Sequence, residues 1–188
     1  MSKSRLFLPF LFFALTSFAA AQIPKGNIFF GYSYARGDLA TGRSSNLNGW
    51  EGSLEGKVFP LLGIVADFSG HYGGTDVPII CPLPPGPPCP SVQISGSEHN
   101  VLFGPRLSAS VGNFRPFAEL LVGVGHVSAS GSGVSSSDTS FATAVGGGLD
   151  YRLIHGVAWR FQGDYLQTRF FSGRQDNTRL STGIVLNF

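Results

Sequence analysis

The sequence predicts an all-β chain that folds as an eight-stranded antiparallel up-and-down transmembrane β-barrel. Three observations predict this fold: the composition, an N-terminal export segment, and eight segments in which apolar and polar residues alternate. Of the 188 residues, 26 are Gly, 17 are Phe and only 13% are charged. This length suits one domain. The composition argues against a disordered chain, which is usually charge-rich, and against a helical bundle.

The first 21 residues have the pattern of a secretory signal peptide. Lys3 and Arg5 precede the apolar run 6–15, and the segment ends in the small residues 19–21. A basic start, an apolar middle and a small-residue end are the three parts of such a signal. A membrane helix would need about 20 apolar residues, and Pro9 interrupts this run. We expect cleavage before Gln22, which leaves 22–188 as one barrel domain.

Removal of that segment makes the chain formally neutral. Without Lys3 and Arg5, the 13 Lys and Arg fall to 11, which equals the 11 Asp and Glu. A neutral chain lacks the basic surface that nucleic-acid binding requires. No later stretch approaches the apolar length of a membrane helix, so membrane insertion would require a closed β-barrel.

Eight segments of alternating polarity follow the export segment. They cover residues 27–36, 50–58, 62–72, 98–111, 117–128, 139–153, 159–165 and 179–188. Their apolar faces run, in order, from Ile28 to Tyr34, Trp50 to Val58, Ile64 to Tyr72, Val101 to Val111, Ala118 to Val124, Phe141 to Leu153, Trp159 to Tyr165 and Leu180 to Phe188. Alternation with period two over about 10 residues is the pattern of barrel strands.

The connections also alternate. Short turns are expected near 59–61, 112–115 and 154–156, and long loops at 37–49, 73–97, 129–138 and 171–177. An up-and-down barrel has its short turns at one end and its long loops at the other. Each long loop contains one Asp, which suits a solvated loop.

Charge distinguishes a membrane barrel from a soluble lipocalin-type barrel. Nearly all strand charges fall on one face, and a strand-centre Arg or Lys facing lipid would cost about 2–4 kcal/mol. The charged face should therefore line the lumen and the apolar face should meet lipid. The expected lumen network comprises Glu51, Glu55, Lys57, Asp67, Glu98, Arg106, Glu119, Asp150, Arg152, Arg160, Asp164 and Arg179. Paired charges would close the lumen, whereas the alternative is a conducting polar pore.

Aromatic residues of the apolar face gather near the strand ends. Those expected at the membrane interfaces are Phe30, Tyr34, Trp50, Tyr72, Phe141, Tyr151, Trp159, Tyr165 and Phe188. Two aromatic girdles are typical of membrane barrels. Two features do not fit regular strands. Pro105 lacks a backbone N–H, so we expect a bulge there. The glycine run 146–148 weakens its strand unless bulky inner side chains lie above it.

At this point the chain resembles the small outer-membrane β-barrel family, the OmpA-like eight-stranded barrel domain of Gram-negative bacteria. The resemblance covers nearly all of residues 26–188 and is carried by the segments 100–106, 116–125, 147–152 and 179–188. It implies a place in the outer membrane, with membrane lipids as partners. It also implies that Phe188 is the aromatic signal read by the barrel assembly machinery.

Cys81 and Cys89 are the two cysteines, and they bracket a proline-rich stretch of the second long loop. Export to an oxidising compartment favours a disulfide between them, with two free thiols as the alternative. Two cysteines without further ligands do not predict a metal site.

One pair of residues suggests an enzyme. His126 and Ser128 share an outward face and resemble the His-x-Ser pair of outer-membrane lipid A deacylases, in which His activates Ser. The nearest downstream acid, Asp138, has the wrong parity for that face, and Ala129 stands where that family has Asn.

The sequence therefore predicts a non-catalytic, monomeric outer-membrane barrel without cofactors, acting through its external loops in adhesion, surface protection or membrane integrity. The alternatives are a small solute channel and a lipid A deacylase-like hydrolase. The extracellular ligand is not indicated by any motif.

Overall fold

The structure, a computed structural model, describes residues 25–39, 43–78, 91–131, 134–170 and 175–188. The expected signal peptide and both cysteines, Cys81 and Cys89, lie outside these residues, so the cleavage site and the disulfide stay predictions. No helix in the described ranges is long and apolar enough to cross a membrane.

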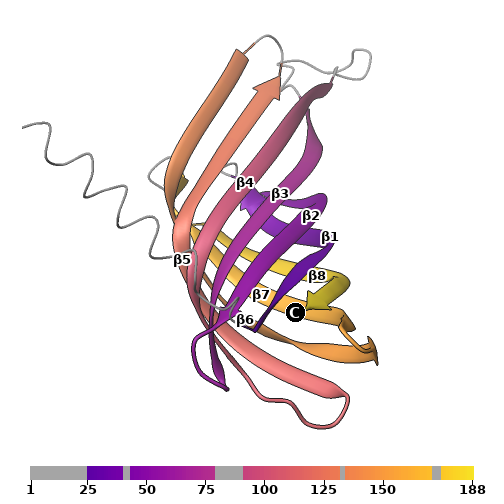
Figure 1. Cartoon of the computed structure of the whole chain (residues 1–188). Helices are drawn as coiled ribbons and strands as arrows, with labels where there is room; N and C mark the ends of the chain where they lie inside the picture. Colours follow the sequence, from indigo (N-terminus) through magenta and orange to yellow (C-terminus); the bar gives the residue numbers. More distant parts are fainter. Residues whose placement is uncertain (1–24, 40–42, 79–90, 132–133, 171–174) are drawn as a thin grey trace, which may run out of the picture.

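Eight strands form one closed antiparallel barrel (Figure 1). They are β1 Gly26–Leu39, β2 Arg43–Lys57, β3 Leu62–Pro78, β4 Ser91–Ser108, β5 Phe114–Gly131, β6 Val134–Ile154, β7 Val157–Thr168 and β8 Gln175–Asn187. Each strand pairs with the next along the chain, and β1 pairs with β8 to close the barrel. The expected fold class is confirmed.

The two faces of the sheet differ as the alternation predicts. Charged side chains such as Glu51, Arg106 and Arg179 are fully buried inside, whereas apolar side chains such as Phe30 and Phe161 are exposed outside. The apolar part of the interior is small and includes a cluster of Val65, Leu102, Leu121, Ala142, Ala144 and Leu166. This is the reverse of a soluble barrel, in which the lumen is apolar and the exterior polar.

Three tight connections lie at one end, which we call the turn end. Residues 58–61 join β2 to β3, 109–113 join β4 to β5, and 155–156 join β6 to β7. Gly112 and Gly156 have φ values of +60° and +80°, a conformation that favours glycine. The start of β1 meets Phe188 here as well, because Gly26 and Phe188 exchange backbone hydrogen bonds of 3.1 and 3.0 Å.

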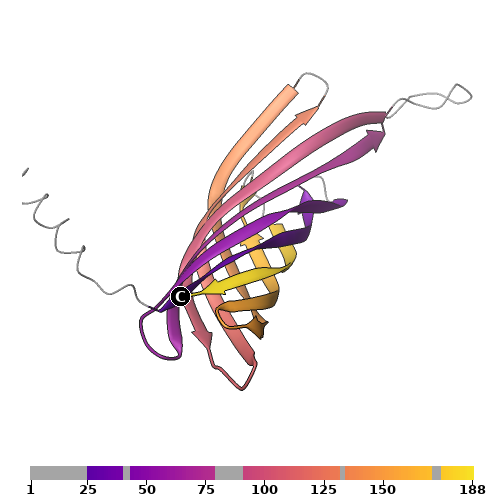
Figure 2. The same cartoon turned by 45° about the vertical axis from the view of Figure 1, so that its right-hand side comes forward.

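The opposite end, the loop end, differs from the sequence prediction. Strand residues occupy much of the expected loops: β3 continues to Pro78, and β6 already begins at Val134. The strands from β3 to β6 have 17, 18, 18 and 21 residues, whereas β7 has 12. A membrane crossing needs about 9–11 residues. Figure 2 shows these four strands extending well past β7 and β8 on one side of the barrel.

Pro105 does not produce the expected bulge. The β4–β5 ladder pairs Phe103 with Val122 and Arg106 with Glu119, so the register is the same on both sides of the proline. The two pairs between them are missing, which accommodates the absent N–H by a short interruption of the ladder. The register shift lies elsewhere, between Arg152 and Ile154 of β6.

Two of the three glycines 146–148, Gly146 and Gly148, lie beneath inner side chains, as expected, whereas the nearest neighbours of Gly147 are backbone atoms of β5. A Cβ added at Gly148 would come within 2.7 Å of the Phe117 ring and 2.2 Å of the Phe161 carbonyl oxygen. One added at Gly146 would meet the Asp164 carboxylate. Glycine is therefore needed at these inward positions, because a larger residue would collide with side chains of the lumen.

Candidate functional site

In the lumen, Arg179 of β8 lies at the centre of a group of three carboxylates, and we call these four side chains the clamp. The Arg179 guanidinium lies 2.9 Å from Asp67 Oδ1, 2.8 Å from Asp164 Oδ2 and 3.3 Å from Glu51 Oε2. These carboxylates belong to β3, β7 and β2, so one side chain ties together strands from opposite walls. All four side chains are almost completely buried. Buried carboxylates of this kind require a cation and hydrogen bonds to remain charged.

A second layer lies nearer the turn end and contains two more buried arginines. Arg106 Nη2 lies 2.6 Å from Glu119 Oε2, and Nη1 lies 3.3 Å from Glu55 Oε2. Arg160 contacts Asp150 through Nε at 2.6 Å and Nη2 at 2.9 Å, a bidentate pair. The fork geometry of arginine matches a carboxylate in this way.

Gln162 of β7 joins the two layers. Its Nε2 lies within 3.0 Å of carboxylate oxygens of Glu51, Glu119 and Asp164. On the loop side, the Ser181 hydroxyl donates its hydrogen to Glu51 and lies 2.9 Å from the Ser33 hydroxyl. The polar groups therefore form one connected system along the lumen.

Phe117 of β5 stands between two of the arginines. The Arg106 and Arg160 guanidinium carbons lie 4.4 and 4.6 Å from the centre of its ring. An arginine over an aromatic face is a favourable cation–π contact. This explains why an aromatic residue lies among the charged side chains near the turn end of β5.

The structure brings together all the residues expected in the lumen network except Glu98 and Arg152. Glu98 is buried but accepts a hydrogen bond of 3.1 Å from Asn100. Arg152 keeps the register of the inner pair Asp150 and Arg160, but it is exposed because it lies near the end of β6, beside the turn. Arg115, expected in a turn, instead joins the network through Glu55 at 2.9 Å. Its odd-numbered parity, shared with Phe117 and Glu119, is the sequence signal that could have revealed it.

Comparisons with known proteins bear on the fold. No protein-family model matches the chain, and no curated protein matches its sequence. Solved structures do match: Ail of Yersinia pestis in complex with the heparin analogue sucrose octasulfate has 17% identity and a TM-score of 0.59, over 88% of this chain and 100% of that one. Neisserial surface protein A has 13% identity and a TM-score of 0.62, over 87% and 97%. The protease OmpT of Escherichia coli has 9% identity and a TM-score of 0.52, over 89% and 98%.

The chain has the fold of a small outer-membrane β-barrel.

The aromatic side chains that were expected at the membrane interfaces lie on the exterior of the barrel. Of the nine expected at the interfaces, eight are exposed and Tyr34 is half-buried. On the turn side, Phe30, Ile184, Trp159, Tyr151 and Phe114 form a continuous row of cross-strand pairs. Trp159 also donates a hydrogen bond of 2.8 Å to the Thr182 hydroxyl. Their place at the membrane interfaces stays a prediction.

The geometry does not join His126 to Ser128 of the barrel. His126 Nδ1 lies 2.7 Å from the Thr139 hydroxyl, and Ser128 pairs across the sheet with Ser97 and Ser137. His126 instead stands opposite His99 on the neighbouring strand. Within the described ranges, no group of three or more His, Cys, Asp or Glu residues is placed to hold a metal ion.

Proposed function

We propose that the chain is a non-catalytic outer-membrane protein that interacts with other surfaces, as in adhesion, through the loop end of its barrel. It would be exported by its N-terminal signal, assembled through Phe188 and held among outer-membrane lipids as a monomer. Ail, one of the similar structures, is an attachment invasion locus protein and was crystallised with a heparin analogue. That similarity adds plausibility, but the proposal rests on a feature of this chain.

The observation that carries the proposal is a sheet that projects beyond the barrel wall. The β6–β7 ladder starts at Ala142 and Thr168, so residues 134–141 of β6 pair only with β5 among the described residues. On the other side, the β2–β3 ladder ends at Asn48 and Tyr72, while β3 continues to Pro78 against β4. The projecting parts of β3 to β6 thus form a sheet with two open edges.

The composition of this projection differs from that of the barrel below it. Residues 134–140 of β6 include four serines and a threonine, and Ser135, Ser136 and Ser137 are all exposed. The lipid-facing residues further down the same strand are Phe141, Val145 and Leu149. Serine on both faces suits water and not lipid. Seven strand residues at about 3.3 Å each extend roughly 23 Å.

An open strand edge is a ready surface for another protein. Its free N–H and C=O groups can pair with an added strand, and main-chain hydrogen bonds then supply affinity. The alternative of a solute channel is not favoured, because the arginine and carboxylate layers fill the lumen with fully buried side chains. An eight-stranded barrel is just wide enough for its own side chains.

The test shortens the β5–β6 side of the projection and leaves the barrel below it unchanged. Replacing residues 129–136 with Asn-Gly joins Ser128 to Ser137, which already face each other, by a turn suited to hairpins. Bacteria carrying the native or shortened chain would be tested for adherence to epithelial monolayers and heparin-coated beads.

We expect the native chain to increase adherence and the shortened chain to lose that increase. Faster gel migration of both chains before boiling would show that each barrel is closed. The proposal fails if the native chain confers no adherence, or if the shortened chain adheres as well as the native one.

A further inference from the structure

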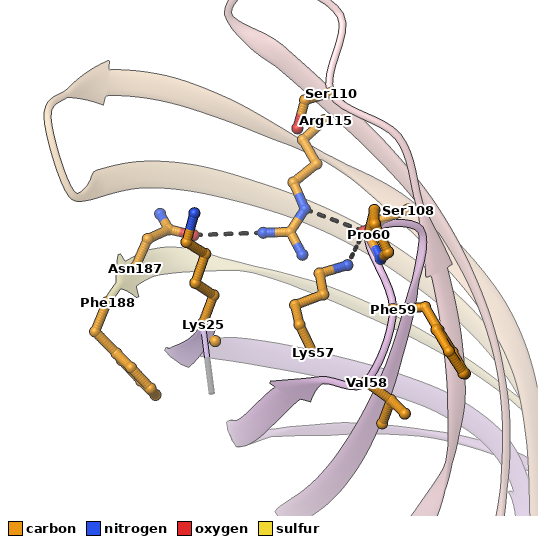
Figure 3. Close-up of a pocket in the computed structure, with 11 residues that line it drawn as sticks. Lys25, Lys57, Val58, Phe59, Pro60, Ser108, Ser110, Arg115, Asn187 and Phe188 are labelled. Atoms are coloured by element: carbon orange, nitrogen blue, oxygen red, sulfur yellow. Dashed lines mark hydrogen bonds between the residues drawn. The ribbon is translucent and has the colours of Figure 1, made fainter. Parts of the chain in front are cut away.

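The turn end of the barrel contains a cavity of about 610 Å³ whose wall is unusually basic. Lys25, Lys57 and Arg115 line it, and Figure 3 shows their side chains directed toward the same space. They come from the residue directly before β1, from β2 and from β5. The hydroxyls of Ser108 and Ser110 also line the cavity.

The positive charge here exceeds the negative charge. Glu55 Oε1 lies 2.9 Å from both Lys57 Nζ and Arg115 Nη2, so one carboxylate oxygen serves two cations. The other oxygen of Glu55 is 3.3 Å from Arg106. Among the described residues, Glu55 is the acid that contacts Lys57 and Arg115, so the three cations of the cavity outnumber it. An adjoining cavity of about 490 Å³ adds Arg152, His155 and Asp150, and the carboxylate of Asp150 is paired with Arg160.

Several donors of the cavity remain available. An ammonium group has three N–H donors and a guanidinium has five. Lys57 uses two of its donors, for Glu55 and Ser108, so one is left. Arg115 uses three, for Ser108, Asn187 and Glu55, so two are left. The carbonyl oxygen of Lys25 accepts a hydrogen bond from Lys57, but its Nζ makes no hydrogen bond or ion pair with the described residues.

We propose that this cavity binds a phosphate group. A tetrahedral phosphate presents several oxygens to donors on different sides, and it would supply the negative charge that the three cations lack. The lysines and Arg115 would contact the phosphate oxygens, with Ser110 as an additional donor. Phosphate would thereby bridge Lys25, β2 and β5 at the turn end.

Two sources could provide the phosphate: an anionic phospholipid headgroup or a free phosphate ion. Exposed apolar side chains surround the cavity, among them Phe59 and Phe188 at 62% and 52% exposure. A lipid lying against these rings could extend its headgroup over the rim. A free ion would need only the cations, so the two sources can be distinguished by experiment.

The experiment uses the mature chain in two arms. In maltoside micelles, titration calorimetry measures binding of inorganic phosphate. In nanodiscs of phosphatidylcholine with or without phosphatidylglycerol, native mass spectrometry measures retained phosphatidylglycerol. The variants are Lys25→Gln and Lys57→Gln, and the charge-matched control is Arg36→Gln, which removes an exposed cation of β1 toward the loop end.

We expect each lysine variant to bind phosphate about tenfold more weakly, the effect of losing one hydrogen bond to a charged group, and the Arg36 control to bind normally. Binding in the micelle arm identifies free phosphate as sufficient, and binding only in nanodiscs identifies the lipid. Lys25→Gln touches no bond of the barrel network, so a folding defect cannot imitate the result. The proposal is overturned if neither arm shows binding, if the lysine variants bind like the native chain, or if the control is weakened equally.

Discussion

Replacing Arg179 by methionine tests whether the charged lumen network holds the barrel together. The substitution keeps an unbranched side chain of similar reach but removes the cation that Asp67 and Asp164 contact at 2.9 and 2.8 Å. Removing one partner of a buried ion pair costs about 3–5 kcal/mol, because the other charge is left uncompensated. We therefore expect the free energy of unfolding to fall by about that amount, 3–5 kcal/mol.

The assay is urea unfolding of the barrel in lipid vesicles, followed by tryptophan fluorescence. The matched control is Arg152→Met, because Arg152 shares the parity of the network in the sequence but is exposed in the structure. We expect no measurable change for this control. A third variant, Arg179→Met with Asp67→Asn and Asp164→Asn, removes the orphaned charges and should recover much of the loss. Equal losses for Arg179→Met and Arg152→Met would refute the assignment of Arg179 to the clamp.

Three further predictions concern packing and closure. Phe117→Leu should lower the free energy of unfolding by about 1–2 kcal/mol, because the contacts of its ring with Arg106 and Arg160 are lost; an unchanged urea midpoint would argue against those contacts. Gly148→Ala should cost about 1–3 kcal/mol by overpacking, whereas Gly56→Ala, with no atom within 4 Å of the added Cβ, should be neutral in the same assay. On an SDS gel the unboiled protein should migrate faster than the boiled protein, and identical migration would contradict a detergent-resistant closed barrel.

The faces of the strands could be predicted from the sequence because they depend on a period of two. Outward positions of a strand favour apolar residues and inward positions favour charged or polar ones. The residue types of Phe161 and Arg160 therefore predict that the first faces outward and the second inward. Even the apolar Phe117 on the inner face has a physical reason, since it packs between arginines. The lumen residues therefore followed from the alternation.

The ends of the strands could not be predicted in the same way. Residues 134–140 are rich in serine, which is typical of loops, yet they continue the β5–β6 hairpin. Backbone hydrogen bonds between the two strands of a hairpin do not depend on side-chain polarity. The β5–β6 ladder can therefore continue in the same register where the side chains change from apolar to polar. Arg152 and Arg115 differ from the prediction for a related reason. Both keep the inward parity, but whether an arginine near a strand end reaches the lumen network depends on its place beside the turn.

The pairing of β1 with β8 also determines how the barrel can fold. Every other strand pair joins neighbours in the sequence, and these hairpins can form early because the loops they close are short. The seam instead joins Asn27 to Asn187, the first and last parts of the barrel. Contacts between such distant residues are the slowest to form. We expect the neighbouring hairpins to form first and to join into one open sheet, with β1 and β8 as its two edge strands. Folding intermediates should then expose these two edges to other chains until β1 pairs with β8 and closes the barrel.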